Sequence, residues 1–339
     1  MADSGRLAWL DVARGGSIIL VVFFHATIQL EKADLGNHHF WLVNNLFGPI
    51  RMPVFFAISG FLAQRLITQD WRAVLSRRVW LLAYLFVTWS ILHALHRRSL
   101  GVTDSPVMTE FAANLVEPAS EIWFILALGL YVVATKALAG VPRPLVIGTA
   151  LVVSIATLGG FAPVTSQAYL GTLQYYVFFL VGCFYGSRIA ARVTDVPLAL
   201  IAGLGVLYGI LIGIRFDLDG LPLGLVRVTL CLIGLVIGCR VAELVTRLAP
   251  VQAVVGFLGR HTLPIYLAHP FVLSLALLGL PSEALPRGAG YLLLPALVFG
   301  SIAASLALRQ LAERRGGGWL YAPPALGGLA AAFRGTGRS

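Results

Sequence analysis

Three ionisable side chains lie on one side of the first hydrophobic segment, and their types suit acid–base or nucleophilic chemistry. Asp11, Arg14 and His25 all fall within residues 7–30, and His25 lies deep among apolar neighbours. The eleven steps from Arg14 to His25 make about three helical turns, which returns both side chains to nearly the same face roughly 16 Å apart. Ionisable groups inside a membrane span are costly and usually mark a pathway or a reactive site. The pair therefore favours a membrane enzyme over a passive helical bundle.

The chemistry open to these residues follows from their ordinary properties. Imidazole titrates near neutral pH, so His25 can take a proton from a hydroxyl group or act as a nucleophile, and burial favours the neutral form that both roles need. Arg14 is always cationic and can hold a phosphate group or pair with Asp11, three residues earlier. The spacing alone supports a structural explanation equally well. In that explanation, His25 is a buried histidine that hydrogen-bonds a neighbouring helix, and Arg14 only anchors the end of the segment.

The elements that must position these residues are membrane spans. Hydrophobic residues make up 58% of the chain and charged residues only 12%, against about 25% charged in soluble domains. Ten apolar runs approach or reach the 17 to 25 residues that cross a bilayer: 7–30, 49–66, 79–95, 122–138, 145–161, 169–189, 198–214, 221–239, 263–280 and 291–308. We therefore predict an all-α integral membrane protein, a bundle of about ten transmembrane helices. A transmembrane domain would cover residues 1–315, and residues 316–339, rich in Gly, Ala and Pro, would form a flexible cytoplasmic tail.

The basic surplus fits topology better than nucleic-acid binding. The formal net charge is +10, and with a cytoplasmic amino terminus and alternating sides, 18 of the 25 Lys and Arg residues fall on the inner side. Nine of the 15 acidic residues then fall on the outer side. This is the positive-inside pattern, and contact with anionic lipid headgroups follows as a secondary effect. We expect a multi-pass protein with both termini in the cytoplasm and no nucleic-acid partner.

Four motifs, in order along the chain, resemble one family. They are the segment 10–15 followed by His25 and Ala26, the run Met-Pro-Val-Phe-Phe-Ala-Ile-Ser-Gly-Phe at 52–61, Glu-Ile-Trp-Phe at 121–124, and Leu-Gly-Arg-His-Thr-Leu-Pro-Ile-Tyr-Leu-Ala-His at 258–269. Each is weak alone, but together they span most of the chain and are specific. They resemble the acyltransferase-3 family, the integral membrane O-acyltransferases that modify bacterial surface glycans.

The resemblance implies a fold, a donor and a set of residues. It implies ten core helices, a cytoplasmic acyl-CoA donor, most simply acetyl-CoA, and a glycan or lipid-linked sugar acceptor on the outer side of a bacterial inner membrane. Its most characteristic motif matches Arg14 and His25, so we expect His25, Arg14 and Asp11 to form the catalytic group. Arg14 would also bind donor phosphates, together with Arg77 and Arg78, although topology explains the latter two equally well.

Two positions depart from the family pattern. A more extended arginine pattern is usual after Arg77 and Arg78, and here Val79 and Trp80 follow. Arg51 stands where the family frequently has a histidine before the Met-Pro pair, and an arginine cannot serve as a general base. The resemblance therefore leaves the role of Arg51 without an explanation.

Further residues complete the predicted site. Glu121 is expected to orient an acceptor hydroxyl, Trp123 to stack on a sugar or belong to the interfacial aromatic belt, and His269 to bind substrate or relay a proton. The remaining histidines near outer ends, His93 among them, are expected to be solvated. Ser59-Gly60 is expected to allow close helix packing. The histidine spacing matches no metal motif, so we expect no metal ion.

The predicted function is transfer of an acyl group, most simply acetyl, from acyl-CoA to a glycan hydroxyl. The alternative from another class is a proton-coupled transporter or flippase that uses buried Arg14 and His25. A degenerate member that only binds partners is a third explanation. The sequence does not name the acceptor glycan, the acyl chain or the oligomeric state, and homo-oligomerisation stays open.

Overall fold

The protein is a bundle of helices, as expected. The structure, a computed structural model, describes residues 7–118, 121–278, 285–286 and 288–324, and every regular element in these ranges is helical. The longer helices are α1 (Ala8–Lys32), α2 (His38–Ile67), α4 (Trp80–Ser99), α6 (Trp123–Ala137), α7 (Arg143–Leu158), α8 (Gln167–Arg192), α9 (Leu198–Ile214), α10 (Gly220–Val245), α12 (Thr262–Leu277) and α13 (Ala289–Arg314). Each of the ten predicted spans overlaps one of them, which confirms the fold class.

Length and composition suit most of these helices to a bilayer. Within the described ranges, seven helical stretches are long and apolar enough to cross a membrane, among them the continuous stretch Trp71–Ser99. Helices α6, α7 and α12 are also apolar but have only 15 or 16 residues. About ten spans therefore remains the best count. The predicted ninth span ends at residues 279–280, which lie outside the described residues.

Helix α2 begins eleven residues before the predicted span. Asn37 caps it, because its side-chain oxygen accepts a hydrogen bond from the backbone N–H of His39 at 2.9 Å. Phe40 and Asn44 in the added turns are buried against the bundle. The prediction counted only apolar runs. It therefore missed the first turns of α2, whose polar side chains form hydrogen bonds with nearby residues.

Shorter elements join the long helices. These are α3 (Trp71–Val74), the π-helical η1 (Leu75–Val79), α5 (Val107–Val116), α11 (Ala249–Arg260) and the 3₁₀ turns η2 (Val193–Asp195), η3 (Arg215–Asp217) and η5 (Gly317–Leu320). Helix α11 packs along α1 and leads directly into α12. This connection places the start of α12 beside the first turns of α1.

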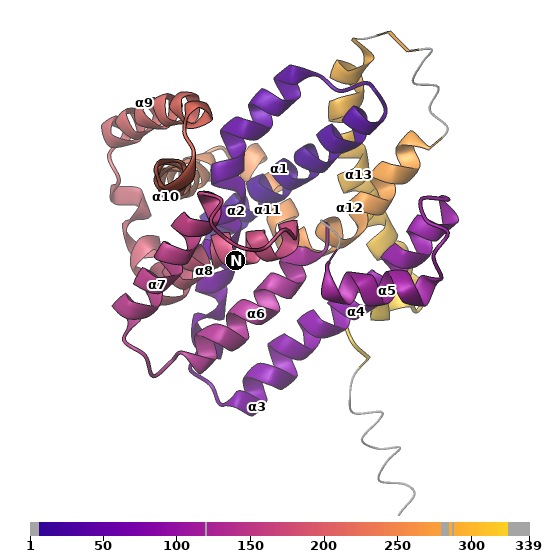
Figure 1. Cartoon of the computed structure of the whole chain (residues 1–339), viewed down its shortest axis with the longest axis horizontal. Helices are drawn as coiled ribbons and strands as arrows, with labels where there is room; N and C mark the ends of the chain where they lie inside the picture. The colour runs from indigo at the N-terminus through magenta and orange to yellow at the C-terminus, as the bar shows by residue number, and fades with distance from the viewer. Residues whose placement is uncertain (1–6, 119–120, 279–284, 287, 325–339) are drawn as a thin grey trace, which may run out of the picture.

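Helices α1 and α2 occupy the middle of the molecule. In Figure 1, α9 and α10 lie at one side, α4, α5, α12 and α13 lie at the other, and α1, α2 and α11 run between them. The contacts agree, because α1 touches α2, α10, α11, α12 and α13, while α2 touches α6, α8 and α10. Side chains in the middle of these helices, such as Ile18 and Val22 of α1 and Phe56 of α2, are fully buried as a result. We call the end of the bundle where α1 begins the Arg14 end, and the opposite end the Glu121 end.

Glycines allow the central helices to approach closely. A Cβ atom on Gly60 of α2 would overlap the carbonyl oxygen of Phe179 on α8, and one on Gly182 of α8 would overlap that of Ala57 on α2. Gly259 of α11 meets the Asp11 carbonyl of α1 in the same way. Small residues let backbones approach in membranes, where no hydrophobic effect drives helices together. The packing expected at Ser59-Gly60 is confirmed for Gly60.

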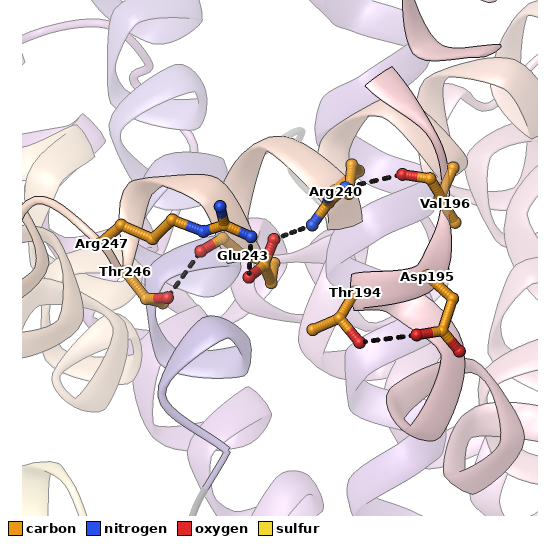
Figure 2. Close-up of polar contacts among 7 residues, drawn as sticks. All are labelled: Thr194, Asp195, Val196, Arg240, Glu243, Thr246 and Arg247. Carbon is orange, nitrogen blue, oxygen red and sulfur yellow. Dashed lines mark hydrogen bonds and ion pairs between the residues drawn. The ribbon is translucent and has the colours of Figure 1, made fainter. Parts of the chain in front are cut away.

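A buried charge cluster fixes the connection between α8 and α9 (Figure 2). Arg240 and Glu243 of α10 are 6% and 8% exposed and form an ion pair, and Arg247 Nη2 lies 3.2 Å from the second Glu243 oxygen. Arg240 Nε also donates to the Val196 carbonyl oxygen at 3.1 Å. Because every charge in the cluster has a partner, the cluster holds the chain just before α9 against the end of α10.

The predicted tail begins with an ordered contact. Residues 317–320 form η5, and its carbonyl groups accept hydrogen bonds from α4: Tyr84 Oη donates to Trp319 at 2.8 Å and Trp89 Nε1 donates to Leu320 at 2.8 Å. The tail therefore starts on the surface of α4. Residues 1–6 and 325–339 lie outside the described residues, so the domain boundary at 315 stays a prediction.

The glycine contact between α2 and α8 predicts a specific sensitivity. Gly182→Ala should lower the free energy of unfolding by about 1–3 kcal/mol, because the added methyl group overlaps the Ala57 carbonyl and forces the helices apart. Gly209→Ala in α9 is the matched control, since a Cβ there meets nothing within 4 Å. Thermal unfolding in detergent measures both. Equal melting temperatures for the two variants would contradict the packing.

The charge cluster predicts a second stability difference. Glu243→Ala should destabilise the protein by about 3–5 kcal/mol, because Arg240 would keep a buried charge without its counter-ion. Glu313→Ala removes an exposed partner of Arg309, 2.8 Å away on α13, and should cost about 0–1 kcal/mol. Chemical denaturation followed by far-UV circular dichroism compares the two. A Glu243→Ala variant as stable as Glu313→Ala would show that the cluster is not structural.

Candidate active site

His25 lines a pocket bounded by α1, α2, α6, α8 and α12. The pocket has a volume of about 380 Å³, within the range of small-molecule sites. Glu121 and Trp123, both predicted site residues, line it with His25. His25 therefore lies in the wall of an open pocket, and three predicted residues, from α1 and from the start of α6, meet there.

His269 lies directly behind His25. Its Nε2 atom is 3.2 Å from His25 Nδ1, and its side chain is fully buried on α12. His269 Nδ1 lies 3.0 Å from the Ile265 carbonyl oxygen and 2.9 Å from that of Tyr266. The structure therefore joins two histidines that are 244 positions apart in the sequence.

The partners of these rings assign their hydrogens. A carbonyl oxygen only accepts, so His269 Nδ1 carries the hydrogen and, in a neutral ring, Nε2 accepts. His25 Nδ1 faces that accepting nitrogen and also the Val21 carbonyl oxygen at 3.0 Å, so it too must carry hydrogen. In neutral His25 the lone pair is then on Nε2, which has no hydrogen-bond partner among the described residues. This nitrogen is therefore the one that can accept a proton.

Glu121 is held by a histidine from α4. His93 Nε2 lies 3.4 Å from the Glu121 carboxylate, and His93 is only 8% exposed. The expectation that His93 is solvated was therefore wrong: α4 packs against the start of α6 and buries it. Burial alone would raise the pKa of Glu121, but the hydrogen bond from His93 and the nearby histidine charges outweigh burial and hold that pKa below its ordinary value. The pocket wall consequently carries an ionised carboxylate.

Aromatic side chains form another part of the pocket wall. Trp123 lies near Tyr175, with ring centroids 6.4 Å apart and planes inclined by 30°, and near Phe56 at 5.8 Å. The hydroxyl of Tyr266 accepts a hydrogen bond from the Phe124 N–H at 3.3 Å, which ties the start of α6 to α12. Trp123 is thus a half-buried part of the pocket wall, and its roles in sugar stacking or in the interfacial aromatic belt stay predictions.

Arg51 also lines the pocket, from α2. Its Nη1 atom donates to the Leu20 carbonyl oxygen at 3.2 Å, and its guanidinium carbon lies 4.4 Å from the centre of the Phe24 ring. The side chain is half-buried. Arg51, which stands where the family frequently has a histidine, therefore lies in the wall of the His25 pocket.

Asp11 and Arg14 lie away from this pocket, at the Arg14 end. Arg14 Nη2 donates to Thr262 Oγ1 at 2.6 Å, and Asp11 is buried with Arg260 Nη1 at 3.7 Å from its carboxylate. This second group joins the starts of α1 and α12 with the end of α11. Neither residue is in the lining of the His25 pocket, so the structure separates the predicted catalytic group into two places on α1.

Arg77 and Arg78 form a third location. They lie in η1, a π-helical turn inside the continuous stretch Trp71–Ser99, and Arg77 is exposed while Arg78 is half-buried. Single π-turns frequently occur at functional sites. The structure does not place either arginine in the lining of the His25 pocket.

Comparison with known proteins places the chain in a family. The family model described as an acyltransferase domain matches residues 7–310. The inner membrane protein YcfT of Escherichia coli (strain K12) is 24% identical over 355 residues, covering 94% of this chain and 96% of that protein. No solved structure matches the chain. Because the acyltransferase model covers nearly the whole sequence, this protein belongs to the acyltransferase-3 family and is a multi-pass membrane acyltransferase.

Proposed function

We propose that this protein transfers an acyl group, most simply acetyl, from acyl-CoA on the cytoplasmic side to a hydroxyl group of an extracytoplasmic glycan. The observation that carries the proposal is the His25 imidazole in the pocket lining, whose Nδ1 is held by Val21 and His269, which leaves the Nε2 lone pair to accept a proton. Acyl transfer to an alcohol needs a base at this position. The family and the similarity to an inner membrane protein support an inner-membrane location.

The proposed reaction begins with the acceptor hydroxyl beside His25. Nε2 takes the hydroxyl proton as the oxygen attacks the thioester carbonyl carbon, forming the new C–O bond. The C–S bond then breaks, and the thiolate of CoA leaves with the proton from the imidazolium. His269 keeps His25 in the tautomer that this step requires and accepts a hydrogen bond from the ring as it becomes charged. Glu121, held by His93, would orient the acceptor.

The two groups on α1 suit a donor and an acceptor from opposite sides. Arg14 lies near the start of α1, and His25 lies eleven residues further, roughly 16 Å along the axis. Donor phosphates would bind at the Arg14 end, where Arg14 and Arg260 supply positive charge, and the thioester would extend toward His25. Arg77 and Arg78 would add charge for the same phosphates. With the Arg14 end facing the cytoplasm, the Glu121 end receives the glycan.

His25→Ala tests the base directly. The variant should lose acyl transfer by at least about 10²-fold, because the general base contributes that much or more. The assay is release of free CoA from acetyl-CoA by purified protein in detergent, with and without added glycan. A matched control is His39→Ala, since His39 is exposed at the start of α2 and contacts Tyr291.

The same assay separates the enzyme from the transporter. An enzyme turns over in detergent without a sealed compartment, whereas a transporter needs one. A fully active His25→Ala variant with a normal melting temperature would remove His25 from the reaction. No CoA release in detergent or in vesicles, together with proton-coupled solute uptake into sealed vesicles, would contradict the enzyme.

His269→Ala tests the positioning of His25. We expect a loss in kcat of about 10- to 100-fold, because one hydrogen bond to a ring that becomes charged is worth about 1.5–3 kcal/mol. His25 would keep its base and its bond to the Val21 carbonyl oxygen but lose the second acceptor, His269 Nε2, that stabilises the charged ring. His269→Gln, which offers an amide oxygen to Nδ1, should recover part of the rate.

The control for this variant is His261→Ala. His261 Nδ1 donates to the carbonyl oxygen four residues earlier, Phe257, at 2.8 Å, as His269 Nδ1 does to Ile265, but His261 is only half-buried and does not line the pocket. The pH dependence of kcat provides a second readout, since a merely structural role would lower activity without moving the profile. If His269→Ala leaves both kcat and its pH dependence unchanged, His269 does not assist His25 in the reaction.

A further inference from the structure

Arg51 is a positive charge in the pocket wall that makes no ion pair with a carboxylate of the described residues. Of its five N–H donors, one has a partner among the described residues, the Leu20 carbonyl oxygen at 3.2 Å. Glu121, the acidic residue in the same lining, is paired with His93.

Other arginines in the bundle show the contrast. Arg240 is buried in α10 and is neutralised by Glu243. Charged side chains in membrane proteins are costly unless they pair or face a cavity that holds a ligand or water. Arg51 lines a pocket but forms no ion pair with a described residue. Its charge is therefore available to a substrate that fills the pocket.

The geometry of Arg51 suits an anion. One face of its guanidinium lies over the Phe24 ring at 4.4 Å, which limits rotation of the group. The bond to Leu20 fixes a second direction. A planar guanidinium held in this way presents its remaining N–H groups as a fork, the arrangement that binds carboxylate or phosphate through two hydrogen bonds.

We propose that Arg51 binds an anionic group, a carboxylate or a phosphate, on a substrate whose reacting atoms lie at His25. This inference rests on the proposed function and names the class of substrate that it uses. The anion belongs either to an acidic glycan acceptor or to a dicarboxylic acyl group on the donor. Both sources offer the same chemistry to Arg51.

Binding and turnover with matched pairs of probes test the assignment. Isothermal titration on the full-length protein in detergent would compare glucuronate with glucose, glucose 6-phosphate with glucose, and succinyl-CoA with acetyl-CoA. The wild type should bind the anionic member of at least one pair about tenfold more tightly or better, and the pair that shows it identifies the source. Turnover of the same donors with the same sugars should show the preference in KM.

Three variants make the test specific. Arg51→Gln should abolish the preference, and Arg51→Lys should keep part of it, since an ammonium group retains charge but not the fork. Arg227→Gln is the control: Arg227 of α10 also donates Nη1 to a backbone carbonyl, Leu158 at 3.0 Å, but it does not line the pocket. It should preserve the preference.

The outcomes decide between this site and other roles. A wild type that shows no preference for any anionic probe overturns the inference, and that measurement needs no variant to fold. A preference that persists in Arg51→Gln also overturns it. An equal loss of kcat on neutral and anionic substrates would instead assign Arg51 to the oxyanion of the reaction. Because binding is measured without turnover, failure of acyl transfer in the His25 experiments is distinguishable from failure here.

Discussion

Every polar group inside a bilayer must find its partner within the protein, and this constraint organises the structure. No water in the hydrocarbon region can hydrogen-bond an exposed donor or acceptor. His25 and His269 each bond a carbonyl four residues earlier on their own helix, and Arg51 bonds a carbonyl on the neighbouring helix. These bonds fix the rings and the guanidinium in single orientations. The need to hydrogen-bond polar groups within the protein, in the absence of water, thereby orients the functional groups.

The same constraint separates structural charges from functional ones. The Arg240 cluster is closed, because two arginines share the oxygens of Glu243 and a carbonyl takes a remaining donor. Arg51 and the Nε2 atom of His25 are incompletely partnered by the described residues and both line one cavity. In a membrane protein, a polar group left open toward a cavity is the mark of a binding or reactive site.

The central position of α1 and α2 explains how one helix serves two ends of the molecule. Helix α1 carries Arg14 near its start and His25 in its second half, and α11 and α12 pack along it. Close contact at Gly259 brings the α11–α12 junction, with Arg260 and Thr262, to Asp11 and Arg14. Further along, α12 supplies His269 behind His25. The pair α1 and α12 thus defines the line between the proposed donor and acceptor sites.

The sequence by itself determined the elements and the chemistry of the first span. Apolar runs long enough for a bilayer predicted ten helices that the structure contains, and the Arg14–His25 spacing on one helix needs only the helical repeat. Fold class and family follow from local patterns, because burial in lipid imposes the same apolar composition on every span.

Only the tertiary structure decided which residues meet. His269 is 244 positions from His25, and no pattern along the chain sets their distance. Arg51 lines the pocket because α2 packs against α1, and His93 contacts Glu121 in the pocket wall because α4 packs against α6. Asp11 and Arg14, by contrast, share a helix face with His25 but do not line its pocket. They contact Arg260 and Thr262 at the junction of α11 and α12. A helical repeat fixes direction and rise within one element, whereas contacts between elements depend on how closely the helices can pack, here on glycines such as Gly60 and Gly182.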